Sequence, residues 1–250
     1  MQFFKKYIYQ FLSIIFILLA WQLAAMAMKN GLILPSPGRI LVDFFTLVTS
    51  TDFYIALAST LLRGFIGFLI AFVLAALIGI PAGIFRGFHD FFNPIIVLLR
   101  STPVISFILL ALIWFGPDNV PVFIAILTMF PLLCKGFISG IKSTDKELID
   151  MALVYKVRRH RILSGLYIPS LLPFLFNGMS NALGFGWRAV IIGEVLSQPR
   201  WGLGTEMQVA QTYLLVSKLI CWSIVAVIMA FFFEWLLGLI ERRSLRWKQI

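Results

Sequence analysis

Residues 142–173 read KSTDKELIDMALVYKVRRHRILSGLYIPSLLP and form the only long, charge-dense segment in an otherwise apolar chain. The charges are mixed in sign, which is typical of a folded, water-facing helix pair with i,i+4 partners, whereas a block of one sign would repel itself. Pro169 and Pro173 then open the next apolar run, and proline is tolerated in the first turn of a helix. The segment therefore predicts a water-facing helix pair that leads into a membrane helix.

The composition excludes a soluble globular protein. Of the 250 residues, 60% are hydrophobic and only 13% are charged, which is too few charges for the surface of a soluble domain. A bilayer core about 30 Å thick needs roughly 20 mostly apolar residues per helix. Six stretches satisfy this requirement, at about 8–28, 57–84, 92–115, 119–141, 168–192 and 213–240.

The fold class that these spans predict is an all-α membrane protein with six transmembrane helices. Residues 1–250 make one transmembrane domain, with core spans at about 57–240 and a polar loop at about 142–167, because no soluble domain fits between the spans. The first span follows Lys5 and Lys6, but its apolar run is longer than that of a signal peptide and lacks a clear cleavage site. We therefore expect a retained span.

The basic residues predict how the chain is oriented. Most of the 21 Lys and Arg residues fall in segments on the same side of the membrane as the N-terminus. The positive-inside rule then places both termini and the 142–167 loop in the cytosol, with about 32–54 and 198–212 outside. The net charge of +10 is thus a topology signal, and because several spans separate the charges, it does not indicate a nucleic-acid partner.

No motif in the chain indicates catalysis, nucleotide binding or a metal site. The segment GFISGIKST at 136–144 has the wrong glycine spacing for a P-loop, so we expect no ATP site in this chain. His89 and His160 lie in charged turns without paired carboxylates or zinc-ligand spacing. Cys134 and Cys221 fall within spans, where cysteines are usually packing residues.

The segments between the spans are short. Residues 29–53 carry paired prolines and an amphipathic run, which predict a helix at the outer interface. Residues 85–94 and 116–121 are expected to be tight turns, and 198–214 a polar outer loop. Small residues gather in spans two and five, which predicts that these two helices form the centre of the bundle.

Ionisable residues within membrane spans usually face a cavity or a partner. Arg100 and Arg188 are two such cations, on spans three and five, and an unpaired arginine in a low-dielectric cavity attracts anions. Alternatively, such residues form ion pairs inside the bundle or reach the headgroups. Arg188 and Glu194 are too far apart in sequence for an i,i+4 pair. The candidate pathway residues are Arg100, Ser101, Thr102, Ser106, Asn181, Arg188 and Glu194.

The spacing of 150–169 resembles the cytosolic loop of ATP-binding-cassette (ABC) importer permeases. Their pattern is E-A-A, then Gly six residues after the Glu, then I-x-L-P with its Pro nineteen residues after the Glu. The matching positions here are Asp150, Met151, Ala152, Lys156, Leu166, Ile168 and Pro169. Met151 stands for Ala and Lys156 stands for Gly, and the second departure puts the family's tight turn in question.

Other segments resemble permeases of the nitrate, sulfonate and taurine importer group. Residues 168–196 are similar to the group's fifth span and 99–116 to its third span. ILPSPGRI at 33–40 is similar to the group's outer loop and LIERRSLRW at 239–247 to its C-terminal tail. The resemblance covers the chain from about residue 32 to 247.

This resemblance implies a multi-pass protein of the bacterial inner membrane with the architecture of type I ABC importers. It also implies partners: a second permease copy, two cytosolic ATPases that hold ATP and Mg²⁺, and an extracytoplasmic binding protein that delivers the solute. Residues 142–166 would be the element that couples to the ATPase. Its candidate contact residues are Glu147, Asp150, Ala152, Lys156, Arg158, Arg159, Leu166, Ile168 and Pro169.

Two other classes of protein are weaker interpretations. A secondary transporter usually carries an internal repeat and midplane acidic residues, whereas this chain shows no repeat and almost no such acids. A membrane-embedded enzyme would need clustered His, Asp or Glu residues, which the sequence lacks. The resemblance leaves the solute open among nitrate, sulfonates, taurine, vitamin precursors and others. Because the resemblance places Arg100 and Arg188 along the pathway, we expect the solute to carry a negative group such as a sulfonate or a carboxylate.

Overall fold

The computed structural model describes residues 2–28 and 33–244, and the elements in these ranges are helices. They run, in chain order, as α1 (Gln2–Met28), α2 (Pro37–Val48), α3 (Thr51–Ile84), α4 (Arg86–Ser101), α5 (Val104–Trp114), α6 (Val120–Lys142), α7 (Lys146–Val154), α8 (Arg159–Ile162), a π-helical turn (Leu163–Tyr167), α9 (Ile168–Ser197), α10 (Leu203–Thr212) and α11 (Val216–Ser244).

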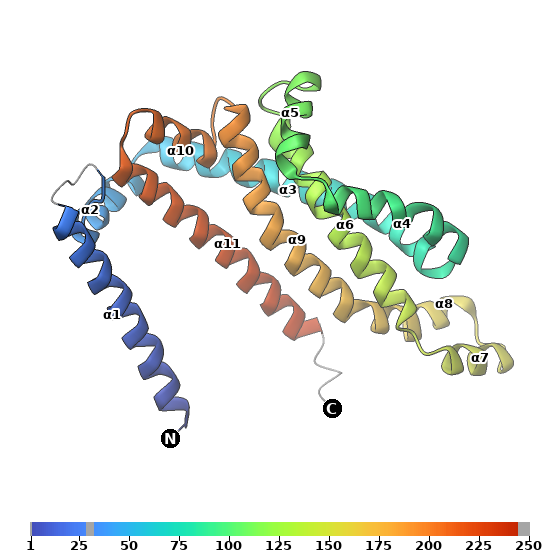
Figure 1. Cartoon of the computed structure of the whole chain (residues 1–250). Helices are drawn as coiled ribbons and strands as arrows, with labels where there is room; N and C mark the ends of the chain where they lie inside the picture. Colours follow the sequence, from blue (N-terminus) through green and yellow to red (C-terminus); the bar gives the residue numbers. More distant parts are fainter. Residues whose placement is uncertain (1, 29–32, 245–250) are drawn as a thin grey trace.

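Helix α6 is the centre of the bundle, packed between α3 on one side and α9 on the other (Figure 1). Small residues permit this close approach. A Cβ added to Gly67 of α3 would lie 2.4 Å from the Cβ of Ala125 on α6. A Cβ added to Gly136 of α6 would lie 3.4 Å from the Cα of Gly178 on α9. The glycines of spans two and five thus pack as expected, but the helix between them is span four, which corrects the predicted centre.

The predicted spans agree well with the long helices. Among the described residues, α1, α3, α6, α9 with the turn before it, and α11 are each long and apolar enough to cross a bilayer. The bent pair α4 and α5 would make the sixth span. Helix α3 begins at Thr51, six residues earlier than expected, because Ser50 accepts a hydrogen bond from the Phe53 amide and caps the helix N-terminus.

The third span is not the single helix that was predicted for 92–115. Helix α4 ends at Ser101, α5 begins at Val104, and the two axes differ by 96°. Pro103 explains the break, because a proline disfavours the helical conformation in the preceding residue. Thr102 has φ −75° and ψ 131°, which is extended backbone. The tight turn that was expected at 85–94 is also wrong, because α4 already begins at Arg86.

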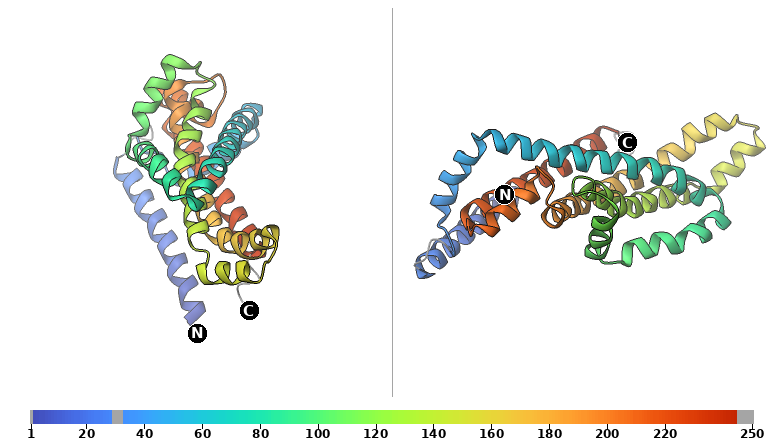
Figure 2. Two further views of the ribbon diagram at one scale, coloured as in Figure 1. Left: turned by 90° about the vertical axis from the view of Figure 1, so that its right-hand side faces the viewer. Right: turned by 90° about the horizontal axis from the view of Figure 1, so that it is seen from above.

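The two ends of the bundle carry different elements. Helices α7 and α8, the N-terminal end of α1 and the C-terminal end of α11 lie towards one end, in the lower part of Figure 1 and of the left view of Figure 2. Helices α2 and α10 lie at the other end. We refer to these as the α7 end and the α10 end. Residues 203–212 were expected to belong to a loop, but they form α10, which packs on α9 and α11.

Candidate functional site

A polar cavity of about 440 Å³ opens between α4, α6 and α9. Arg100 comes from the last turn of α4, Lys135 from the middle of α6, and Asn177 and Asn181 from α9. The Asn181 amide nitrogen donates to Oδ1 of Asn177 at 2.6 Å, so the two amides lie side by side at the cavity wall. The structure therefore brings two of the predicted pathway residues, Arg100 and Asn181, to one site.

The cavity lies on an open face of α9. Asn177, Asn181, Phe185 and Arg188 recur at helical spacing and are exposed. The Arg188 guanidinium carbon lies 5.9 Å from the centre of the Phe185 ring, and Phe185 itself lines the cavity. Arg188 therefore lies next to the cavity, further along α9, and does not line it.

The charges around this cavity are positive. In the part of the chain that the structure describes, the ion pairs involve none of Arg100, Lys135 and Arg188. An arginine or lysine within a membrane span and without a carboxylate partner attracts anions. The net positive charge around the cavity therefore favours anions over cations.

Three other predicted residues lie outside this cavity. The hydroxyl groups of Ser101 and Thr102 donate to the Leu98 carbonyl of their own helix, at 3.2 and 2.8 Å. Ser106 is on α5, beyond the break at Pro103, and is exposed. The break turns α5 away from the line of α4, so the polar strip expected from consecutive residues does not form on one face.

Glu194 lies in a separate, buried network. Its side chain has no exposed surface and accepts hydrogen bonds from the Thr60 hydroxyl at 2.9 Å, from Arg63 at 2.9 Å and from the Gly204 amide at 3.0 Å. Arg63 also pairs with Asp118 at 3.0 Å. Glu194 thus neutralises Arg63 and not Arg188. Arg63 and Glu194 therefore form the ion pair inside the bundle that was the alternative to lining a cavity.

The predicted coupling segment is helical, as expected. Asp145 caps α7 by accepting from the Glu147 amide at 2.8 Å. The C-terminus of α7 ends in a turn in which the Val157 amide donates to the Ala152 carbonyl at 2.9 Å. Lys156 occupies the left-handed position of this turn with φ 54°. The turn that the family pattern assigns to Gly therefore forms here with Lys.

The surface of α7 differs from the sequence expectation in two ways. Ion pairs at i,i+4 were expected, but the structure has none between residues 142 and 167. Ala152 is buried, whereas Val154 and Tyr155 are 78% and 76% exposed and Met151 is also exposed. The free face of α7 is therefore largely apolar, with charged residues beside it.

The remaining coupling candidates surround this apolar face. Glu147, Asp150, Arg158 and Arg159 are exposed. Where the π-helical turn joins α9, Ile168 of α9 is exposed, and Leu166 of the turn and Pro169 of α9 are partly buried. The sequence reasoning missed Val154 and Tyr155, although two consecutive large apolar residues in the only charge-dense loop were a visible signal.

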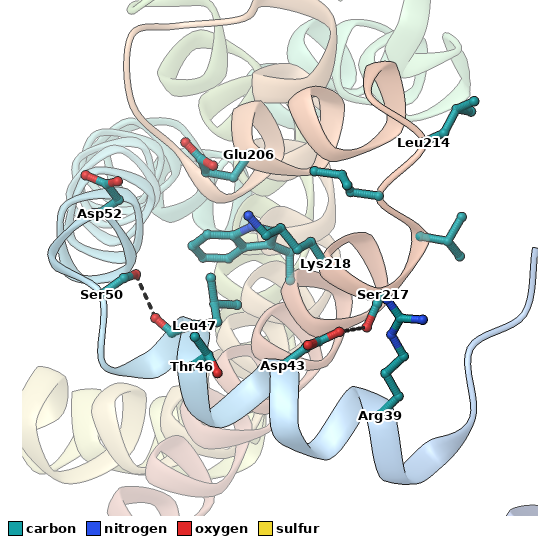
Figure 3. Close-up of a pocket in the computed structure, with 13 residues that line it drawn as sticks. Arg39, Asp43, Thr46, Leu47, Ser50, Asp52, Glu206, Leu214, Ser217 and Lys218 are labelled. Atoms are coloured by element: carbon teal, nitrogen blue, oxygen red, sulfur yellow. Dashed lines mark hydrogen bonds between the residues drawn. The ribbon is translucent and has the colours of Figure 1, made fainter. Parts of the chain in front are cut away.

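A second cavity, of about 430 Å³, lies at the α10 end between α2, α10 and the start of α11 (Figure 3). Its charged lining residues are of both signs: Arg39, Asp43, Asp52, Glu206 and Lys218. Asp43 accepts a hydrogen bond from Ser217, which ties α2 to α11. Burial raises the pKa of the Glu206 carboxyl above its ordinary value of 4.5; the nearby Asp52 charge raises this pKa further, and Lys218 opposes the shift.

Comparison with known proteins gives the family. Residues 72–246, from the middle of α3 to beyond the end of α11, match the model of the binding-protein-dependent transport system inner membrane component family. The chain belongs to this family. It is therefore an ABC-type transport permease with several membrane-spanning helices, and not an enzyme in its own right.

Three relatives show the group within the family. The chain is 26% identical over 235 residues to the putative aliphatic sulfonates transport permease protein SsuC of Bacillus subtilis (strain 168), covering 93% of this chain and 84% of the relative. It is 29% identical over 237 residues to the taurine transport system permease protein TauC of Escherichia coli (strain K12), covering 91% and 84%. The E. coli (strain K12) SsuC protein is 30% identical over 234 residues, covering 92% and 88%. The sulfonate and taurine permeases are thus similar to this permease over almost its full length.

Proposed function

We propose that this ABC importer permease forms, with a second copy of itself, the membrane pathway for a small anionic solute. The observation that carries the proposal is the cationic cavity between α4, α6 and α9, which is lined by Arg100, Lys135 and two asparagine amides. Two ATPases would hold ATP and Mg²⁺ and drive transport, and a binding protein would deliver the solute.

The open face of α9 supports the second copy. Polar and charged side chains on a membrane helix do not face hydrocarbon, and they instead line water-filled paths or pack against protein. Asn177, Asn181 and Arg188 are exposed in the single chain. A second copy across this face would enclose the cavity and its cations in a shared path.

The positive cavity supports an anionic solute. A sulfonate oxygen accepts hydrogen bonds from guanidinium, ammonium and amide donors, which are the groups that Arg100, Lys135 and Asn181 present. Three relatives are named as aliphatic sulfonates or taurine transport permeases, which agrees with this chemistry. We therefore propose a sulfonate, a carboxylate or a similar anion as the solute class.

The exposed face of α7 supports docking of an ATPase. A pore subunit without a P-loop must receive the energy of ATP through contact, and Met151, Val154 and Tyr155 offer an apolar surface for that contact. If α7 moves as a rigid lever with the ATPase, it would rock α6 and α9 and open the cavity to the other side. The coupling role of Asp150 and its neighbours would then be to orient the docked partner.

The sidedness of the chain is part of the proposal. The basic residues favour the α7 end in the cytosol and the α10 end, with its mixed-charge cavity, on the outer side where a binding protein would dock.

Labelling of single cysteines at Ser143 and Thr205 with a membrane-impermeant thiol reagent in intact cells tests this orientation, in a background without Cys134 and Cys221. Position 205 should react from outside and position 143 should not. Labelling of position 143 from outside would refute the orientation.

Uptake measurements test the pathway. Proteoliposomes would hold the permease with its copurified ATPase, with ATP inside and the binding protein and radiolabelled taurine or methanesulfonate outside. Arg100→Gln and Lys135→Gln should each lower uptake about tenfold or more, while ATPase copurification stays intact. Arg243→Gln, which removes the same charge at the end of α11, is the matched control and should transport normally.

Two results would count against this function. Normal uptake by the Arg100→Gln, Lys135→Gln double variant would show that the cavity is not the pathway. Full uptake by the permease alone, without ATPase, would instead favour the secondary transporter.

A further inference from the structure

A cavity of about 550 Å³ lies at the α7 end of the molecule, and it shares no lining residue with the cavity between α4, α6 and α9. It forms where the C-terminal ends of α3 and α6 meet the first turns of α4 and α7. Arg86, Lys142 and Lys146 supply three cations from three different helices or their ends. Elements far apart in the sequence thus build one basic site.

The charge balance of this cavity is positive. Asp90 is the one carboxylate that lines it, and it lies 3.8 Å from Arg86 and 3.2 Å from His89. Among the described residues, Lys142 and Lys146 have no carboxylate within ion-pair distance. The cavity therefore has two ammonium groups that are free to bind an anion.

Two further kinds of hydrogen-bond donor border the cavity. Thr144 lines the cavity and is only 6% exposed, and its hydroxyl has no hydrogen-bond partner. The first turn of α4 borders the cavity, and no side chain caps its amide groups. Uncapped amides at a helix N-terminus together with lysines and a hydroxyl are the donors that bind phosphate oxygens.

The remaining walls are apolar. Ile84, Ile141 and Ile149 line the cavity beside the cations. Ile84 also ends an exposed stripe on α3 that includes Leu77 and Ile80, since these residues recur at helical spacing. The stripe runs from the cavity along a helix long and apolar enough to span the bilayer. A ligand that fits both parts has an anionic head and an apolar tail.

We propose that this cavity binds the phosphate headgroup of an anionic phospholipid, with an acyl chain along the Leu77–Ile84 stripe. Basic pockets between membrane helices at the cytosolic surface suit such headgroups. Bound there, the headgroup would join Lys142 and Lys146, at the two sides of the turn into α7, to Arg86 on α4. The lipid would thereby hold the start of α7 in place against the α3–α4 junction.

Native mass spectrometry of the full chain, released from nanodiscs of equal parts phosphatidylglycerol and phosphatidylcholine, tests the proposal. The wild-type chain should retain phosphatidylglycerol over phosphatidylcholine by about tenfold or more. The double variant Lys142→Gln, Lys146→Gln should lose most of this preference, and Thr144→Val should reduce it. The double variant Arg242→Gln, Arg243→Gln removes two cations at the end of α11 and should keep it.

The readout is lipid retention and does not depend on transport, so this proposal can fail while the transport function holds. Equal retention of the two lipids, or an unchanged preference in the Lys142→Gln, Lys146→Gln variant, would overturn it. Millimolar inorganic phosphate added to the nanodiscs separates the two sources of a phosphate group. Loss of phosphatidylglycerol to free phosphate would show a soluble-anion site and would also overturn the lipid assignment.

Discussion

Arg63 of α3 and Glu194 of α9 form an ion pair of 2.9 Å at the α10 end of the bundle, although 131 residues separate them. Glu194 is completely buried and the side chain of Arg63 is 13% exposed. Close approach of the backbone makes room for the carboxylate, because a Cβ added to Gly202 would lie 2.6 Å from Cδ of Glu194. The pair therefore fixes α3, α9 and the segment before α10 relative to one another.

Replacing this buried carboxylate should strongly destabilise the protein. Glu194→Gln would leave Arg63 and the Gly204 amide without their charged acceptor, and breaking a buried pair costs on the order of 3 kcal/mol. Asp118→Asn removes the other carboxylate bonded to Arg63, but its side chain is 64% exposed, so its loss should cost less than about 1 kcal/mol. Thermal unfolding in detergent compares the two variants. Equal falls in the unfolding midpoint would contradict the structural role of Glu194.

The turn after α7 gives a prediction of opposite sign. Lys156 has a positive φ, which costs a non-glycine residue about 1 kcal/mol, so Lys156→Gly should stabilise the turn. A β-branched residue is less compatible with this conformation, so Lys156→Val should destabilise it. Hydrogen exchange of the Lys156 and Val157 amides measures both effects.

A matched control for this turn is Met151→Gly. Met151 lies in the regular part of α7, where glycine lowers helix stability by about 1 kcal/mol. Exchange in α7 should therefore become faster in this variant and slower in Lys156→Gly. If glycine at position 156 also made exchange faster, the left-handed turn would not limit the stability of α7.

Local sequence signals predicted much of this fold. Apolar runs of membrane-spanning length gave α6 and α11 to within a few residues, and Pro169 marked the start of α9. The break between α4 and α5 was missed, because a count of apolar residues from 92 to 115 does not register that one proline, Pro103, interrupts the hydrogen bonding. The missed element was therefore visible in the sequence.

The candidate site was less predictable. Arg100 and Asn181 were among the predicted pathway residues, whereas Lys135 and Asn177 were not, because neither the spacing nor the composition shows which helix faces meet. The partner of Glu194 was missed for the same reason, since an ion pair across 131 residues leaves no local pattern. Such pairings depend on how α3, α6 and α9 pack, which only the structure provides.

The cavity at the α10 end predicts a dependence of stability on pH. Burial and the nearby Asp52 charge raise the pKa of Glu206, so the folded protein holds this proton more tightly than the unfolded chain. The favourable contribution is fully present below the unfolded pKa, near 4.5, and is lost as pH rises through the folded pKa. The unfolding midpoint of wild type should therefore fall over this window more than that of Glu206→Gln. Parallel curves for the two proteins would refute this coupling.

If an ATPase docks on the apolar face of α7, as proposed, the exposure of this face predicts which residues the docking depends on. Val154 and Tyr155 are each about three-quarters exposed, whereas Ala152 is buried, so a charge at Val154 should disrupt docking directly without disturbing the packing of the helix. Val154→Glu should lower copurification of the ATPase about tenfold or more, and Tyr155→Ala should lower it less. The matched control is Leu214→Glu, which adds the same charge at an exposed leucine of the α10 end. Pull-down of the ATPase by tagged permease in detergent measures docking in all three variants, and size-exclusion chromatography verifies that each variant is folded.

Normal copurification by a folded Val154→Glu variant would show that the ATPase does not dock on this face of α7. A loss of docking in Leu214→Glu would show that the effect is not specific to α7.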